Sequence, residues 1–335
     1  MPLPWLLFPQ SQLWALIGLT LLMSIPGVAL AIGFNSLFAD AVPPEWRAHV
    51  AGVRNALLAI TFIVTSLVCG FILHRLPFPT GYQVVFGVGF VGAAMSSFHL
   101  WFVRPFPGGQ VPPRVGSSLG DMARPGAVNL LGRLRPGVGL RFLTRGGGRP
   151  LLRTEILRGP FGLVVVAMFG FHLAQYLPIP LVPLYLVNQL HFSDQVIGLG
   201  TALLYVTVFV GSTRLAYLTR RSGHKWVMAM GASLMTIYPA LLSVSRGLPL
   251  YIVLSLLGGF GWALAGGALN NYILEKVPPD DRPAHLAWYN LALNAAILLG
   301  SLVGPAVGSW LGLSIALALF AGLRLLMSLF IWRWG

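Results

Sequence analysis

Long apolar stretches alternate with short polar or glycine- and proline-rich segments along most of the chain. An α-helix rises 1.5 Å per residue, so about 20 apolar residues are needed to cross the roughly 30 Å hydrocarbon core of a bilayer. Prolines in the fourth stretch (Pro178, Pro180 and Pro183) predict a kink or an early end of that helix. Nine membrane-spanning helices are expected, at residues 12–38, 48–74, 82–103, 160–186, 195–217, 226–245, 249–275, 284–310 and 313–333.

The composition agrees with a chain that lies mostly in lipid. Of 335 residues, 56% are hydrophobic and 9% are charged, and the mean hydropathy is +0.78. A soluble domain carries about 25% charged residues, so this chain has too few to cover a surface in water. The pattern therefore predicts an all-α integral membrane protein. The single cysteine, Cys69, excludes an intramolecular disulfide.

The net charge of +14 is concentrated on one side of the predicted membrane. The loop 105–159 contains nine arginines but only two acids, Asp121 and Glu155, whereas loops of the opposite parity are nearly bare. Basic residues favour the cytoplasmic side. We therefore expect a cytoplasmic C-terminus, an outside N-terminus of this chain, and a bacterial inner (plasma) membrane as its location.

The basic loop is open to two interpretations. It could bind nucleic acid or anionic lipids, or it could be a flexible tether between two helical bundles. Its arginines are not interleaved with a series of aromatic residues, which a stacking surface for bases requires. This favours the tether, and no nucleic-acid partner is expected.

A repeat joins the two ends of the chain. Residues 35–55 and 270–290 align without a gap at an offset of 235 positions, and both segments link one apolar run to the next. Subtracting 235 from the last three spans gives 14–40, 49–75 and 78–98, which overlie the first three. Repeats of this kind are typical of transporters built from two like halves. The identical pairs are Asn35/Asn270, Val42/Val277, Pro43/Pro278, Pro44/Pro279, Arg47/Arg282 and Asn55/Asn290.

The repeat predicts an incomplete first half. We expect a bundle of three spans at 1–104, the linker at 105–159 and a bundle of six spans at 160–335. The three spans that begin at about residue 160 have no counterpart in the first half. A missed start site and a truncation both remain open as its origin.

Three local patterns, taken together with the repeat, resemble the major facilitator superfamily. Ala216 to Lys225 (AYLTRRSGHK) is similar to the family's Gly-x-Leu-x-Asp-Arg-x-Gly-Arg-Arg signature, but it has Ala216 and Arg220 in place of the glycine and the aspartate. An acid followed seven residues later by arginine occurs in both repeats, as in sugar-porter-like members. The segment Gly300-x3-Gly304-Pro305-x2-Gly308 resembles an antiporter motif but is interpreted more simply as a close-packing helix face.

The resemblance implies a two-bundle fold in which the chain lacks the first three of the family's twelve helices. It also implies that charged residues at cytoplasmic helix ends lock the two bundles together when that side is closed; ordinary topology-setting charges are the alternative. The expected gate residues are Asp40, Arg47, Arg221, Lys225, Glu275 and Arg282.

Polar and aromatic residues inside the spans are candidates for a substrate path, because polar groups are costly to bury in lipid. For each of them, packing or hydrogen bonding between helices is the alternative. Arg324 is the candidate for contact with an anionic substrate. The full set is His172, Gln175, Tyr176, Tyr205, Trp262, Asn290, Asn294, Asn55 and Arg324.

The chain shows no pattern typical of catalysis. All eight acids lie at predicted helix ends or in loops, and the seven histidines are not at metal-ligand spacing. We expect no enzyme activity, metal or cofactor; the coupling ion is unknown. The predicted function is transport of a small solute by alternating access, and the modest polarity of the spans favours an amphipathic or lipophilic compound over a sugar. A non-transporting remnant that acts as a binding or scaffold subunit is the alternative.

Overall fold

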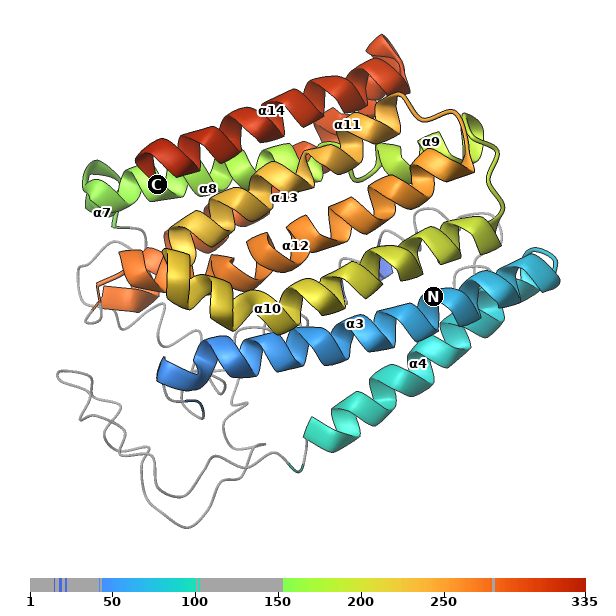
Figure 1. Ribbon diagram of the computed structural model, residues 1–335, viewed down its shortest axis with the longest axis horizontal. Coiled ribbons are helices and arrows are strands. Elements are labelled where there is room, and N and C mark those ends of the chain that lie inside the picture. The colour runs from blue at the N-terminus through green and yellow to red at the C-terminus, as the bar shows by residue number, and fades with distance from the viewer. Residues whose placement is uncertain are drawn as a thin grey trace.

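The described part of the chain is built from α-helices that run in a roughly common direction (Figure 1). The computed structural model describes residues 44–100, 153–278 and 281–335, and the single positions 15, 18, 19, 22, 42 and 102. The helices are α3 (Pro44–Arg75), α4 (Thr80–Leu100), α7 (Glu155–Arg158), α8 (Pro160–Tyr176), α9 (Leu181–Asn188), α10 (Asp194–Met235), α11 (Ile237–Ser243), α12 (Leu248–Lys276), α13 (Arg282–Leu311) and α14 (Leu313–Trp334).

Length and composition make these helices fit to cross a membrane. The described residues contain seven helical runs that are long and apolar enough to do so. Large apolar side chains such as Phe90, Trp310 and Ile315 are mostly exposed, as lipid-facing residues are. The chain is an all-α integral membrane protein, as predicted. The expected span 12–38 lies almost wholly outside the described residues, so the count of nine stays a prediction.

Helix α10 consists of two helical arms joined at a glycine. Its 42 residues would extend about 63 Å if straight, twice the thickness of the hydrocarbon core. Gly223 interrupts it with φ 79° and ψ 160°, a conformation that glycine adopts at little cost. Gly211 and Gly231 both lie against α12 around Ala263 and Ala265, so the two arms run back along each other. The break falls in the segment predicted to separate two spans.

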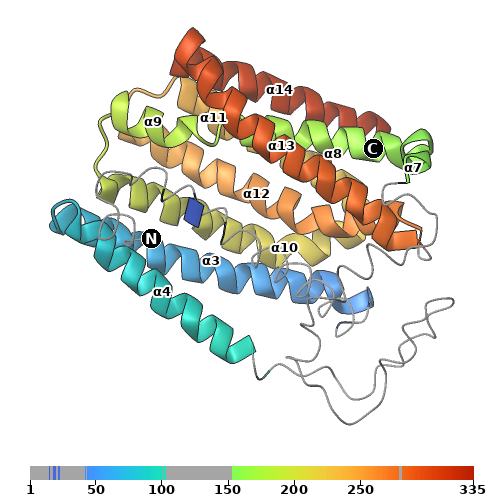
Figure 2. The same cartoon turned by 180° about the vertical axis from the view of Figure 1, so that it is seen from behind.

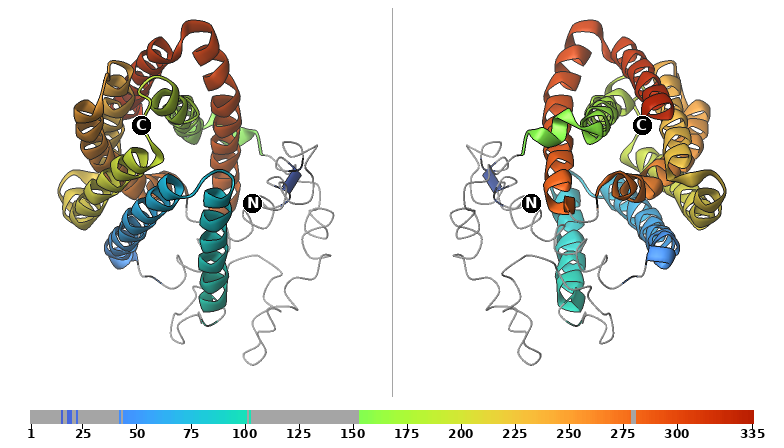
Figure 3. Two further views of the ribbon diagram at one scale, coloured as in Figure 1. Left: turned by 90° about the vertical axis from the view of Figure 1, so that its right-hand side faces the viewer. Right: turned by 90° about the vertical axis from the view of Figure 1, so that its left-hand side faces the viewer.

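Helix α3 packs antiparallel against the first arm of α10 through small residues. A side chain on Gly52 would reach the carbonyl oxygen of Ser212 at 3.0 Å, and one on Gly70 would reach that of Asp194 at 3.1 Å. Such close approach of backbones is typical of helix pairs in membranes. The end-on views place α3 and α4 on one side of the later helices (Figure 3).

The fourth predicted span is broken where its prolines predicted. Helix α8 ends at Tyr176, a turn follows, and α9 begins at Leu181. The glycine face of α13 packs against this turn: a Cβ on Gly300 would lie 2.8 Å from Cβ of Tyr176, and one on Gly308 would lie 2.7 Å from Cδ2 of Leu181. The view from behind shows α13 running across α8 (Figure 2). This geometry agrees with the interpretation of the motif as a packing face.

Two of the apolar clusters of buried side chains lie wholly within the later helices and the turns between them. One includes Met168, Phe171 and Met235; the other includes Leu181 and Leu317. The first lies toward the end of the molecule where α8 begins, the second toward the end where α9 ends. The division coincides with the breaks between α8 and α9 and between α10 and α11.

The helix bounds can be compared with the predicted repeat. Shifting α3 by 235 positions gives 279–310, close to Arg282–Leu311 of α13. The same shift takes α4 to 315–335, close to Leu313–Trp334 of α14. Both pairs are therefore helices of similar length joined by a short turn. The duplication itself stays a prediction.

Gly304→Ala is expected to destabilise the fold, because its Cβ would overlap the backbone carbonyl of Leu177 at the proline turn. Overpacking against backbone costs about 1–3 kcal/mol, seen as a lower midpoint of thermal unfolding in detergent. Gly322→Ala is the matched control, since nothing lies within 4 Å of its Cβ. Equal midpoints for the two variants would contradict the proposed packing.

Candidate functional site

A cavity of about 200 Å³ lies between the broken helices. Helix α8 and the turn after it, α9, α10, α11, α12 and α14 contribute to its wall. It lies beside the division between the two apolar clusters, at the proline turns. Its lining residues are Gln175, Pro178, Ile179, Val182, Leu204, Tyr205, Met235, Tyr238, Pro239, Gly258, Trp262 and Arg324.

Four residues of the predicted substrate path lie together in this wall: Gln175, Tyr205, Trp262 and Arg324. They come from four helices that are far apart in sequence. Tyr205 is held in place by Phe62 of α3, whose ring stacks on it at 4.3 Å between centroids with planes 7° apart. The α3–α10 contact thus reaches the residue that forms part of the cavity wall.

Arg324 is the charged group of the cavity. Its residue is 6% exposed, and its guanidinium donates hydrogen bonds to three backbone carbonyl oxygens, those of Met235 (2.9 Å), Gln175 (3.0 Å) and Ala174 (3.4 Å). Its Nε has no hydrogen-bond partner among the described residues. No carboxylate of the described residues pairs with it.

His172 and Tyr176 lie beside the cavity rather than in its wall. His172 is buried, and its Nε2 shares a hydrogen bond of 3.1 Å with the hydroxyl of Tyr289 on α13. The rings of His172 and Tyr176 are 6.5 Å apart. The sequence did not indicate a role for Tyr289. Tyr289 and Asn290 are adjacent, and nothing in the pattern predicted that Tyr289 rather than Asn290 faces α8.

The three asparagines of the predicted path are placed away from the cavity lining. Asn290 and Asn294 are exposed, and each side-chain amide donates to a carbonyl one turn back in α13, at 2.8 and 2.7 Å. Asn55 is half-buried on α3 and accepts a hydrogen bond from Arg54 at 3.4 Å. All three amides thus form hydrogen bonds within their own helices.

Charged residues gather at one end of the described helices, which we call the basic end; it contains Arg153, the Gly223 turn, Lys276 and Arg333. Of the expected gate residues, Glu275 is paired with His224, Oε1 to Nδ1 2.6 Å, so it links α12 to the turn in α10. Arg221 donates to the hydroxyl of Tyr217 at 3.3 Å.

The structure describes fewer contacts for the other expected gate residues. Lys225 is half-buried, and no ion pair of the described residues includes it. Asp40 and the side chains of Arg47 and Arg282 lie outside the described residues. The structure thus describes contacts for only part of the predicted gate.

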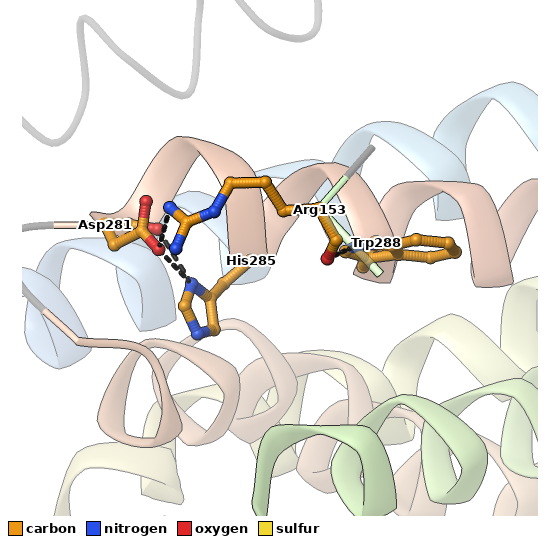
Figure 4. Close-up of polar contacts among 4 residues, drawn as sticks. All are labelled: Arg153, Asp281, His285 and Trp288. Atoms are coloured by element: carbon orange, nitrogen blue, oxygen red, sulfur yellow. Dashed lines mark hydrogen bonds and ion pairs between the residues drawn. The ribbon is translucent and has the colours of Figure 1, made fainter. Parts of the chain in front are cut away.

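A contact that the sequence did not reveal joins residue 153 to the start of α13 (Figure 4). Arg153 forms an ion pair with Asp281 at 2.9 Å, and Trp288 donates its indole N–H to the Arg153 carbonyl at 3.1 Å. His285 Nδ1 lies 3.4 Å from the Asp281 carboxylate. The pair is about one-third exposed, so it contributes at most about 1 kcal/mol and serves mainly to fix the chain entering α7.

No group of three or more metal-ligating side chains occurs among the described residues. The cavity wall contributes one guanidinium, one amide, two phenol groups and the indole of Trp262, and the other lining side chains are apolar. Such a wall can bind a small molecule by apolar contact and a few hydrogen bonds.

Comparison with known proteins identifies related sequences. The family described as Major Facilitator Superfamily matches residues 164–335, which include α9 to α14 and all of the cavity lining. Sugar transport protein 4 of Arabidopsis thaliana is 29% identical over 116 residues. That alignment covers 35% of this chain and only 22% of the relative.

Tyr289→Phe is expected to lower stability, because it leaves the buried Nε2 of His172 without its partner. An unpaired buried polar group costs roughly 1–3 kcal/mol, measurable as a lower thermal midpoint. Tyr217→Phe removes a hydroxyl from an exposed residue and should change stability by less than about 0.5 kcal/mol. If the two variants have the same thermal midpoint, the His172–Tyr289 hydrogen bond does not stabilise the contact between α8 and α13.

Proposed function

The chain belongs to the major facilitator superfamily, and from this premise we propose that it moves one class of small solute through the cavity beside Arg324. The observation that carries the proposal is the convergence of Gln175, Tyr205, Trp262 and Arg324 on one cavity between helices. Membrane-spanning helices place polar groups next to a void where a solute, rather than lipid, is to be bound. Family membership points to a transporter rather than an enzyme.

Alternating access is the mechanism we propose. The six-span unit 160–335 would rock against the unit 1–104 across the contact between α3 and α10, around a solute held near mid-membrane. The small residues of that contact suit a surface that slides and re-forms. The expected gate residues Asp40, Arg47, Arg221, Lys225, Glu275 and Arg282 would hold the basic end closed, and that end would face the cytoplasm by the excess of arginines.

The wall favours an amphipathic solute. Proline, isoleucine, valine, leucine, methionine and aromatic side chains form most of the cavity lining, and few groups can bind hydroxyls. A sugar would require several hydrogen-bonding side chains around it, because each buried hydroxyl without a partner costs free energy. The relative named for sugar transport nevertheless makes sugars the comparison class. A membrane subunit that binds the solute without moving it remains the second candidate.

Leu204→Trp is expected to abolish uptake without unfolding the protein. Leu204 lines the cavity, and the larger indole would fill much of its volume. Solutes would first be ranked by thermal stabilisation of purified protein, with hexoses and small amphipathic compounds as the two arms. Uptake of the best radiolabelled compound into proteoliposomes would then be measured.

Leu199→Trp is the matched control, because Leu199 lies on the same helix with 41% of its surface exposed. Uptake should fall at least tenfold in Leu204→Trp and stay within twofold in the control. Equal uptake in both variants would place the solute path elsewhere. Binding without uptake in the unmodified protein would favour the binding subunit.

A further inference from the structure

Two of the helices around the cavity are broken at prolines. Pro178 follows the end of α8, and Pro239 lies in the first turn of α11, four residues after the end of α10. Leu177, Pro180 and Thr236 keep right-handed helical dihedral angles, but regular α-helical hydrogen bonding stops at the ends of α8 and α10. What is lost is the hydrogen bond that a proline cannot donate.

The position of each lost bond follows from helix geometry. The N–H of residue i bonds the carbonyl of residue i−4, and proline has no N–H. Pro178 therefore cannot serve the carbonyl of Ala174, and Pro239 cannot serve that of Met235. In hydrocarbon, each carbonyl left without a donor is costly, because no water replaces it.

Arg324 donates to both of these carbonyls. Its guanidinium bonds the Met235 oxygen at 2.9 Å through one terminal nitrogen, and the Ala174 oxygen at 3.4 Å through the other. The second nitrogen also bonds the adjacent Gln175 oxygen at 3.0 Å. One side chain of α14 thus bridges two helices at the carbonyls that the prolines leave open.

The charge of Arg324 is offset by the same arrangement. A helix C-terminus carries the equivalent of about half a negative charge, and the guanidinium lies at the ends of two helices, α8 and α10. The partial negative charges of the two helix ends together are similar in size to the single positive charge of the guanidinium. This explains how a buried arginine is stable without a carboxylate among the described residues, and it favours a structural role over that of an anion ligand.

The segments beyond the two breaks are also joined to each other. The hydroxyl of Tyr185 in α9 lies 3.3 Å from the carbonyl oxygen of Ser243 and 3.1 Å from that of Ser245, at the end of α11. Leu181 and Leu242 belong to the same apolar cluster. Arg324 joins the end of α8 to the end of α10 before the two breaks, and Tyr185 joins α9 to the end of α11 beyond them. These contacts together fasten α9 and α11 as one part of the cavity wall.

We propose that Arg324 is a positioning residue for the cavity: it takes the place of the N–H groups that Pro178 and Pro239 lack and thereby fixes the two proline turns relative to each other. The proposal rests on the proposed function in treating the cavity as the solute site. It assigns the arginine to the wall rather than to the solute.

The first test is a mutant cycle on purified full-length protein. Arg324→Met should lower the thermal midpoint by roughly 5 °C or more, because it strands two buried carbonyls. The same substitution should cost less than half as much when Pro178→Ala and Pro239→Ala restore backbone donors. Equal losses in both backgrounds would overturn the proposal. If the double proline variant does not fold, the cycle is run with Pro239→Ala alone, where a smaller but non-zero rescue is expected.

The second test measures positions instead of stability. In a Cys69→Ser background, spin labels at the exposed positions Leu184 of α9 and Val244 after α11 report the distance between the two outer segments. Arg324→Met should broaden that distance distribution, and the alanine replacements should narrow it again. Labels at the exposed Val166, in α8 before its break, and Leu326, in α14, are the control pair, because neither lies beyond a proline turn, and their distance distribution should not change. An unchanged Leu184–Val244 distribution contradicts the proposal.

A last arm separates a positioning arginine from an anion ligand. Acetate and inorganic phosphate are added to the unmodified protein and to Arg324→Met. Stabilisation of the unmodified protein alone would make Arg324 a ligand for the anion and overturn the proposal; no difference supports it. None of these measurements uses transport. They can therefore contradict the role proposed for Arg324 while uptake persists, and the uptake result for Leu204→Trp does not affect them.

Discussion

A backbone in hydrocarbon must satisfy its own hydrogen bonds, and the described structure depends on this constraint most where it is broken. Prolines interrupt two helices next to the cavity and leave carbonyls that no backbone N–H at those positions serves. The guanidinium of Arg324 reaches both, while the helix ends offset its charge. The irregular backbone that gives the cavity its shape is thus tolerated because a side chain from a third helix supplies the missing donors.

Glycine sets the complementary constraint, since it decides which helices approach closely enough to surround the cavity. Gly304 admits the carbonyl of Leu177, so α13 lies directly on the proline turn. Gly52 and Gly70 bring α3 against α10, where Phe62 stacks on Tyr205 of the cavity wall. Helices without such a face, α4 above all, remain at the edge and present apolar side chains outward.

Much of the architecture could be read from the sequence because hydrophobic length and proline position are local properties. The spans from α3 to α14, the early end of α8 and the break at Gly223 all follow from residues within one segment. The partners of the polar side chains could not be predicted in this way. Arg324 bonds carbonyls that lie 89 to 150 positions away, and His172 is hydrogen-bonded to Tyr289 rather than to the neighbouring Asn290. Which face of a helix meets which neighbour depends on packing between distant segments. For the same reason the contact of Arg153 with Asp281 could not be predicted from the sequence.

The charge balance around Arg324 bears on the solute as well. A cavity with an uncompensated cation would select an anion, because only the solute could neutralise it in a medium of low dielectric constant. Here two helix ends already lie against the guanidinium, so a neutral molecule can enter without leaving a buried charge unpaired. What the wall then offers is apolar surface, two phenol groups, the indole of Trp262 and one amide, Gln175. Selection among neutral solutes would therefore rest on shape and apolar contact more than on charge, which supports the proposal of an amphipathic solute over a sugar.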